Sequence, residues 1–189
     1  MTQDAIQAAV SHLIALIARG PDEAGLSPGD CAELRRMDPQ GTFPPVMWRL
    51  LTAKAVAGGV TALGGERQRA ERAVASLVQA MLEAGGSPGL RSIGDALADT
   101  NYAEQRFILL LQARGASDVA AQARTVVRWC ATKGVRIRFA DSDRERGFAG
   151  FILAAALDWP GANSRAHSMA RDYFAGSKPQ DDAETPDGE

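Results

Sequence analysis

Residues 117–133 read SDVAAQARTVVRWCATK, and this stretch decides the fold class. Its apolar residues recur at helical spacing and share one face of a helix: Val119, Ala123, Val126, Val127 and Cys130. Arg124 and Arg128 fall on the opposite face, one turn apart, and Lys133 stands at the C-terminal end, where the helix dipole favours a cation. The stretch therefore predicts an amphipathic helix with a basic polar face, capped at its start by Ser117.

The same spacing recurs along the chain, with Gly, Pro and capping residues between the apolar runs. Helices are expected at about 6–17, 28–37, 44–59, 67–83, 90–99, 102–114, 117–133, 141–159 and 163–174. Ser27 is predicted to cap the second helix, with Pro28 at its first position, and Asn101 to cap the sixth in a capping box with Glu104. Only residues 135–139 alternate in the manner of a strand. The predicted fold is all-α: a compact helical bundle of about eight or nine helices, as one body or as two packed lobes.

Two further expectations concern burial. The helix at 102–114 is apolar on every side from Phe107 to Leu111, so it is expected to be central. The last helix is expected to bury one stripe, formed by Ala166, Met169, Ala170, Tyr173 and Phe174.

Charge is distributed unevenly along the 189 residues, whose formal net charge is −2. Residues 177–189 hold five acids and one Lys and have no large apolar residue, which predicts an acidic disordered tail after a helical domain at 1–176. Residues 101–176 hold 11 basic and 7 acidic residues, so the positive charge is concentrated there. Of the 21 basic residues, 18 are Arg, a side chain suited to phosphate; GC-rich codon usage and solvated helix faces are the alternative explanations.

A search for catalytic motifs finds none. The two histidines, His12 and His167, have no carboxylate or thiol at ligand spacing, and the glycine pairs at 58–59 and 64–65 lack the Lys-Ser/Thr of a phosphate-binding loop. A helix start explains the closely spaced acids at 141–145 better than a cation site does. The sequence predicts no enzyme, no metal site and no cofactor.

The chain has no apolar run near the ~20 residues that span a bilayer, so no membrane helix is expected. Its acidic N-terminus is unlike that of a signal peptide, and Cys31 and Cys130 lack metal-ligand spacing. Together these features predict a cytoplasmic protein.

Several stretches, taken in order, resemble one known family. They read GDCAELRR at 29–36, FPPVMWRLL at 43–51, RFILLL at 106–111, RTVVRW at 124–129 and MARDYF at 169–174. In this order they resemble the CasB family, the small subunit of the type I-E CRISPR Cascade complex. The resemblance covers about residues 27–176, and residues 59–89 match poorly.

The resemblance implies an all-helical, non-catalytic subunit present as two copies beside the Cascade backbone and large subunits. It also implies a basic groove that holds the target or displaced DNA strand near the guide RNA during R-loop formation. Arg35 and Arg36 match the family's paired arginines, and Arg49, Arg106 and Arg124 match its other basic positions. Many relatives carry a second basic residue in the central helix where this chain has Gln112, with Arg114 two positions on.

The expected nucleic-acid-binding residues are Arg35, Arg36, Arg49, Arg106, Arg114, Arg124, Arg128, Lys133, Arg136 and Arg138. The alternative is a helical module that binds only proteins, in which these arginines pair with acidic neighbours and nucleic acid is not contacted.

Overall fold

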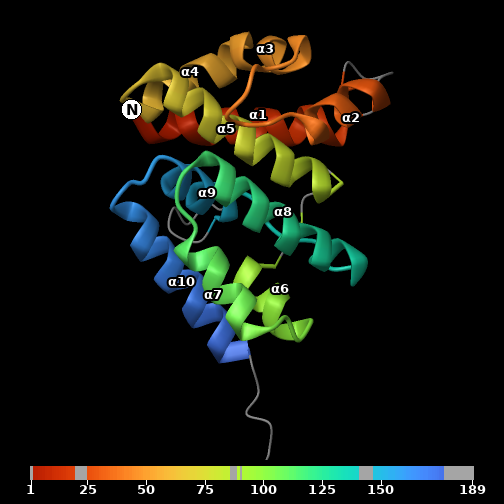
Figure 1. Ribbon diagram of the computed structural model, residues 1–189, viewed down its shortest axis with the longest axis vertical. Coiled ribbons are helices and arrows are strands. Elements are labelled where there is room, and N and C mark those ends of the chain that lie inside the picture. The colour runs from red at the N-terminus through yellow and green to blue at the C-terminus, as the bar shows by residue number, and fades with distance from the viewer. Residues whose placement is uncertain (1, 20–24, 86–88, 90, 141–146, 177–189) are drawn as a thin grey trace, which may run out of the picture.

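The structure is a computed structural model and describes residues 2–19, 25–85, 89, 91–140 and 147–176. These residues form ten helices and no strand (Figure 1). The helices are α1 (Thr2–Ala18), α2 (Pro28–Arg36), α3 (Pro45–Thr52), α4 (Lys54–Leu63), α5 (Arg67–Glu83), α6 (Ile93–Asp99), α7 (Glu104–Gln112), α8 (Ala116–Thr132), α9 (Phe148–Ala156) and α10 (Gly161–Gly176). The all-α prediction is confirmed. The predicted tail at 177–189 and the predicted helix start at 141–143 lie outside the described residues.

Helix α5 lies at the centre of the molecule. Helices α1, α2 and α4 contact it from one side and α8 and α9 from the other (Figure 1). It buries every residue from Ala73 to Leu82, including the polar Ser76 and Gln79. The Ser76 hydroxyl donates to the Ala116 carbonyl at the start of α8 (2.8 Å), which joins the two helices through a buried hydrogen bond. Helices α1–α4 form the first group and α6–α10 the second. Because one hydrophobic core continues across α5, the two groups form one body.

The helices of each group approach closely where a small residue stands at the crossing. In the first group, a Cβ on Gly59 of α4 would lie 2.4 Å from the Ala9 Cβ of α1. In the second group, a Cβ on Gly94 of α6 would lie 2.4 Å from the Met169 carbonyl of α10. Close packing at these crossings therefore requires glycine.

The last helix, α10, contacts α7 and the turn that precedes α7. The ring of Tyr173 stacks on Phe107 of α7 with ring centroids 4.3 Å apart. The Tyr173 hydroxyl donates to the carbonyl of Tyr102 at 2.6 Å, and the two residues are 71 positions apart in the chain. The end of α10 therefore packs on α7 and completes the packing of the second group of helices.

The helix predicted at 44–59 is two helices, which explains why ten are found. Ala53 leaves the helical conformation (φ −57°, ψ 130°), and α3 and α4 meet at 81°. The Thr52 hydroxyl donates to the Trp48 carbonyl (2.9 Å), a local bond that helps to satisfy the end of α3. The bend lets α3 pack on α2 while α4 packs on α1.

In the described part of the chain no single helix is long and apolar enough to cross a membrane; α3 and α4 meet the length and composition criteria only as this bent pair.

Two predicted N-caps, Asn101 and Ser117, are wrong. Asn101 adopts a left-handed conformation (φ 51°) and terminates α6, and its backbone N–H donates to the Ala98 carbonyl at 3.1 Å. Because Asn tolerates this conformation, it is used to end a helix here, and α7 begins only at Glu104. Gly115 replaces Ser117 as the N-cap of α8. By contrast, the Ser27 cap of α2 is confirmed, with a capping box to Asp30.

The expectation that the helix at 102–114 is central is also wrong. Helix α7 buries only Phe107 and Leu110, while the side chains of Ile108 and Leu109 are exposed by 36% and 53%. In α10 the predicted stripe is buried at Ala166, Met169 and Tyr173, whereas Ala170 is half-buried and Phe174 is 50% exposed. The predicted stripe of α8 is buried at all five positions.

The segment at 135–139, which alternates in the manner of a strand, forms only an isolated parallel bridge, between Ile137 and Arg91.

Candidate nucleic-acid interface

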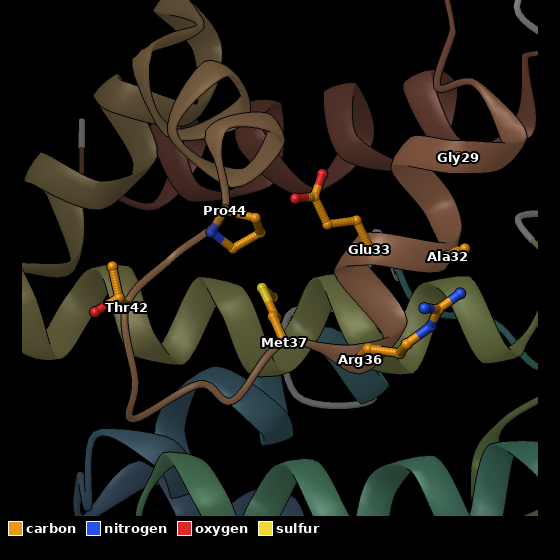
Figure 2. Close-up of a pocket in the computed structure, with 7 residues that line it drawn as sticks. All are labelled: Gly29, Ala32, Glu33, Arg36, Met37, Thr42 and Pro44. Carbon is orange, nitrogen blue, oxygen red and sulfur yellow. The ribbon is translucent and has the colours of Figure 1, made fainter.

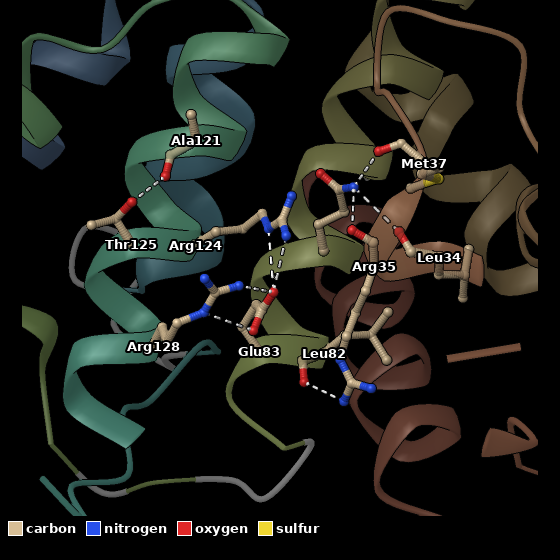
Figure 3. A network of polar contacts seen from close by, with 10 residues as sticks. Leu34, Arg35, Met37, Leu82, Glu83, Ala121, Arg124, Thr125 and Arg128 are labelled. Atoms are coloured by element: carbon tan, nitrogen blue, oxygen red, sulfur yellow. Dashed lines mark hydrogen bonds and ion pairs between the residues drawn. The ribbon is translucent and has the colours of Figure 1, made fainter. Parts of the chain in front are cut away.

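The C-terminal end of α5 brings two candidate arginines of α8 together around one carboxylate. Arg124 donates to Glu83 Oε1 through Nε (3.3 Å) and Nη2 (3.2 Å), as Figure 3 shows. Arg128 donates to Oε1 through Nη2 (2.8 Å) and to Oε2 through Nε (3.4 Å). Both arginines lie outside the buried stripe of α8, as predicted, and their long side chains reach along the flank of α8 to the end of α5.

The end of α2 meets the same end of α5. The Arg35 guanidinium donates to the Leu82 carbonyl at 3.0 Å (Figure 3). The Gln79 amide donates to the carbonyls of Met37 (2.6 Å) and Leu34 (3.2 Å), which are among the carbonyls left over where α2 ends. We call Arg35, Arg124 and Arg128 the arginine cluster. Three guanidinium groups thus surround a helix end whose dipole is negative.

The charges of the cluster shift the pKa of Glu83. Burial alone would raise this pKa, but the hydrogen bonds and charges of Arg128 and Arg124 outweigh it and hold the pKa below its ordinary value. The same carboxylate raises the pKa of Arg128 through its hydrogen bonds and its charge. Glu83 is therefore ionised at neutral pH, and the three arginines exceed it by two positive charges.

Arg36 follows Arg35 as the last residue of α2. It lines an open groove of about 610 Å³ between α2 and the start of α3 (Figure 2). The groove is also lined by Gly29, Ala32, Glu33, Met37, Thr42 and Pro44. Arg36 is exposed and forms no hydrogen bond or ion pair with any described residue. Its guanidinium is therefore available to an external anion.

Three further candidates contact partners of their own within the described chain. Arg49 pairs with Asp30 (2.7 Å), and Lys133 lies over the ring of Trp129, 4.9 Å from its centroid. Arg114 is held at the end of α7 by the carbonyls of Leu111 (3.0 Å) and Ala113 (2.7 Å) and by Asn163 Oδ1 (2.6 Å).

Three candidates remain, one on α7 and two after α8. Arg106 and Arg136 are exposed and form no hydrogen bond or ion pair within the described chain. The backbone amide of Arg138 donates to the Arg91 carbonyl at 2.8 Å, beside the isolated bridge, and its side chain is half-buried.

Glu83 and Gln79 are the residues of this site that sequence reasoning missed. Both lie in the segment 59–89 that resembles the CasB family poorly. Glu83 carried one usable signal, because an acid in the last turn of a helix opposes the helix dipole and therefore indicates a cationic partner. The partner could not be named from the sequence, since Arg124 is 41 residues away.

The described residues contain no group of three or more His, Cys, Asp or Glu side chains arranged to hold a metal ion. Both cysteines are free, and Cys130 is buried in the core. What the site offers chemically is a set of guanidinium donors fixed on two helices, an arrangement suited to binding an anion.

A sequence model of the family described as CRISPR-associated protein Cse2 matches residues 30–174. No curated protein and no solved structure matches the chain. The matched residues run from the first turn of α2 to the last turn of α10, so they include both arginine-bearing helices and well over half of the chain. The family is one of structural Cascade subunits. The chain therefore belongs to the Cse2 family, the CasB small subunits of the type I-E CRISPR Cascade complex.

Proposed function

We propose that this Cascade subunit binds the nucleic-acid backbone through the arginine cluster and Arg36, and that it stabilises the R-loop during target DNA recognition in antiviral defence. The observation that carries the proposal is the convergence of Arg35, Arg124 and Arg128 on the end of α5. Guanidinium groups bind phosphates without reading the base sequence, so specificity is left to pairing with the guide RNA.

The energetics of R-loop formation favour such a role. The exchange of a DNA duplex for an RNA–DNA duplex is nearly balanced, so a few backbone contacts from a protein can tip it. Each phosphate neutralised on a single strand steepens the salt dependence of binding by roughly 0.7 on a log–log scale. A cluster of three to four arginines is therefore sufficient for a measurable effect without catalysis.

The setting of the subunit is part of the proposal. We place it in the cytoplasm, as a non-catalytic component in two copies per complex, beside the Cascade backbone and large subunits. Residues 1–176 are proposed as the helical domain and 177–189 as an acidic tail.

The test is R-loop lifetime in a reconstituted complex that carries the Arg36→Gln, Arg124→Gln and Arg128→Gln substitutions together. The matched control replaces Arg67, Arg69 and Arg72 by Gln, which removes the same charge from the first two turns of α5, at the end opposite to Glu83. We expect the first variant to shorten the R-loop lifetime at least about tenfold more than the control, with a shallower salt dependence. Equal lifetimes in an intact complex would refute the proposed function.

A second function, protein docking alone, is favoured by the exposed apolar side chains of Ile108 and Leu109 on α7. Neighbouring exposed apolar side chains are typical of a docking surface. In this case Leu109→Asp would prevent incorporation into the complex, while the triple arginine variant would leave the R-loop unchanged.

A further inference from the structure

The pairing of Glu83 with Arg124 and Arg128 has the chemistry of a phosphate site. A phosphodiester carries one negative charge and two non-bridging oxygens, which makes it similar to a carboxylate. The two arginines present four donors to the Glu83 carboxylate, each through its Nε and Nη2 atoms, at 2.8–3.4 Å. This edge of a guanidinium is the one that binds carboxylate and phosphate side-on.

The exposure of the three side chains allows an exchange of anions. The Glu83 side chain is only 11% exposed, whereas those of Arg124 and Arg128 are 31% and 60% exposed. The carboxylate thus lies beneath the guanidinium groups, and both arginines can be reached from solvent. Because the guanidinium groups are accessible while the carboxylate is beneath them, a phosphate can approach the two arginines from solvent and compete with the carboxylate for their donors.

The position of Glu83 in its helix also indicates that its carboxylate interacts with the two arginines for a reason other than helix stability. It is the last residue of α5, where the negative end of the dipole disfavours an acid. Helix stability therefore does not account for an acid at this position, and its stabilising contacts come from the two arginines of α8.

We propose that Arg124 and Arg128 form a phosphate-binding cradle and that the Glu83 carboxylate occupies it as an internal competitor, which a nucleic-acid phosphate must displace. This inference rests on the proposed function and adds one residue, Glu83, that sets the strength of nucleic-acid binding. Glu83 keeps the affinity for nucleic-acid backbone moderate, so that the subunit responds to a strand already held by the rest of the complex.

The test measures binding of the full chain to a fluorescein-labelled oligothymidylate by fluorescence anisotropy, with Glu83→Gln compared to wild type. The matched control is Glu66→Gln, which makes the same charge change at the exposed opposite end of α5, about 25 Å away. We expect Glu83→Gln to bind about three- to tenfold more tightly than Glu66→Gln at about 50 mM salt. The gain should disappear when Arg124 and Arg128 are also replaced by Gln.

The outcomes separate this inference from the proposed function. A merely structural tether would make Glu83→Gln bind the oligonucleotide equally or more weakly than Glu66→Gln; that result overturns the competitor role while wild-type binding still supports the proposed function. If neither wild type nor Glu83→Gln binds the oligonucleotide and the triple arginine variant leaves the R-loop unchanged, both proposals fail.

Discussion

Replacing Gln79 by Met should destabilise the protein through the end of α2. The Gln79 amide donates to the carbonyls of Met37 at 2.6 Å and Leu34 at 3.2 Å, and both contacts are buried. Met is close to Gln in volume and flexibility but has no donor, so the substitution leaves two buried acceptors unsatisfied at about 1–3 kcal/mol each. It also removes the Gln79 Oε1 atom, which is itself buried without a partner, and this relief offsets part of the cost.

The net loss is therefore expected to be about 2–3 kcal/mol of unfolding free energy, or roughly 4–12 °C in melting temperature for a chain of this size. The assay is urea unfolding followed by far-UV circular dichroism. The control is Gln68→Met, which makes the same chemical change at an exposed position of the same helix and should stay within about 0.5 kcal/mol of wild type. If Gln79→Met is as stable as this control, the carbonyls at the end of α2 do not depend on Gln79.

Three further outcomes are expected. Because the folded-state pKa of Glu83 lies below its ordinary value of 4.5, the stability that wild type holds over Glu83→Gln should be complete above that pH and should shrink as pH falls below it; a difference that grows in acid would contradict the ion pairing. Burial raises the pKa of Cys130 to about 11, so at about pH 8 Ellman's reagent should modify Cys31 first, and Cys130 should react at a comparable rate only after unfolding. Tyr173→Phe should cost about 1–2 kcal/mol in urea unfolding, because the buried Tyr102 carbonyl loses its donor; a cost below about 0.5 kcal/mol would mean that the carbonyl finds another.

Local signals in the sequence predicted local structure well. The Ser27 cap and the apolar stripe of α8 depend on residues within a few turns of one another, and both are confirmed. The prediction that Asn101 is an N-cap is wrong for a physical reason, since an Asn can begin a helix through its side chain or end one by adopting a left-handed conformation. Only the packing of α6 decides between these uses.

Burial and pairing across the fold could not be predicted in the same way. The all-round apolar character of α7 indicated a central helix, yet α5 is central and tolerates buried Ser76 and Gln79 because carbonyls of other helices accept their hydrogen bonds. Likewise, the counter-charge of Arg124 and Arg128 lies more than 40 residues away, on a helix in the segment that resembles the family poorly. The assignment of the ten basic residues to nucleic acid stays a prediction.

The contacts by which α10 completes the packing of the second group of helices have a consequence for synthesis on the ribosome. Helices α1–α4 find their partners among their neighbours in sequence, so they can assemble while the chain is still growing. Tyr102 and Phe107, by contrast, emerge long before Tyr173, which supplies the hydrogen bond to one and the stacked ring for the other. Until α10 is made, this part of the nascent chain exposes apolar surface to chaperones and proteases, so premature termination within α10 would leave a half-folded product.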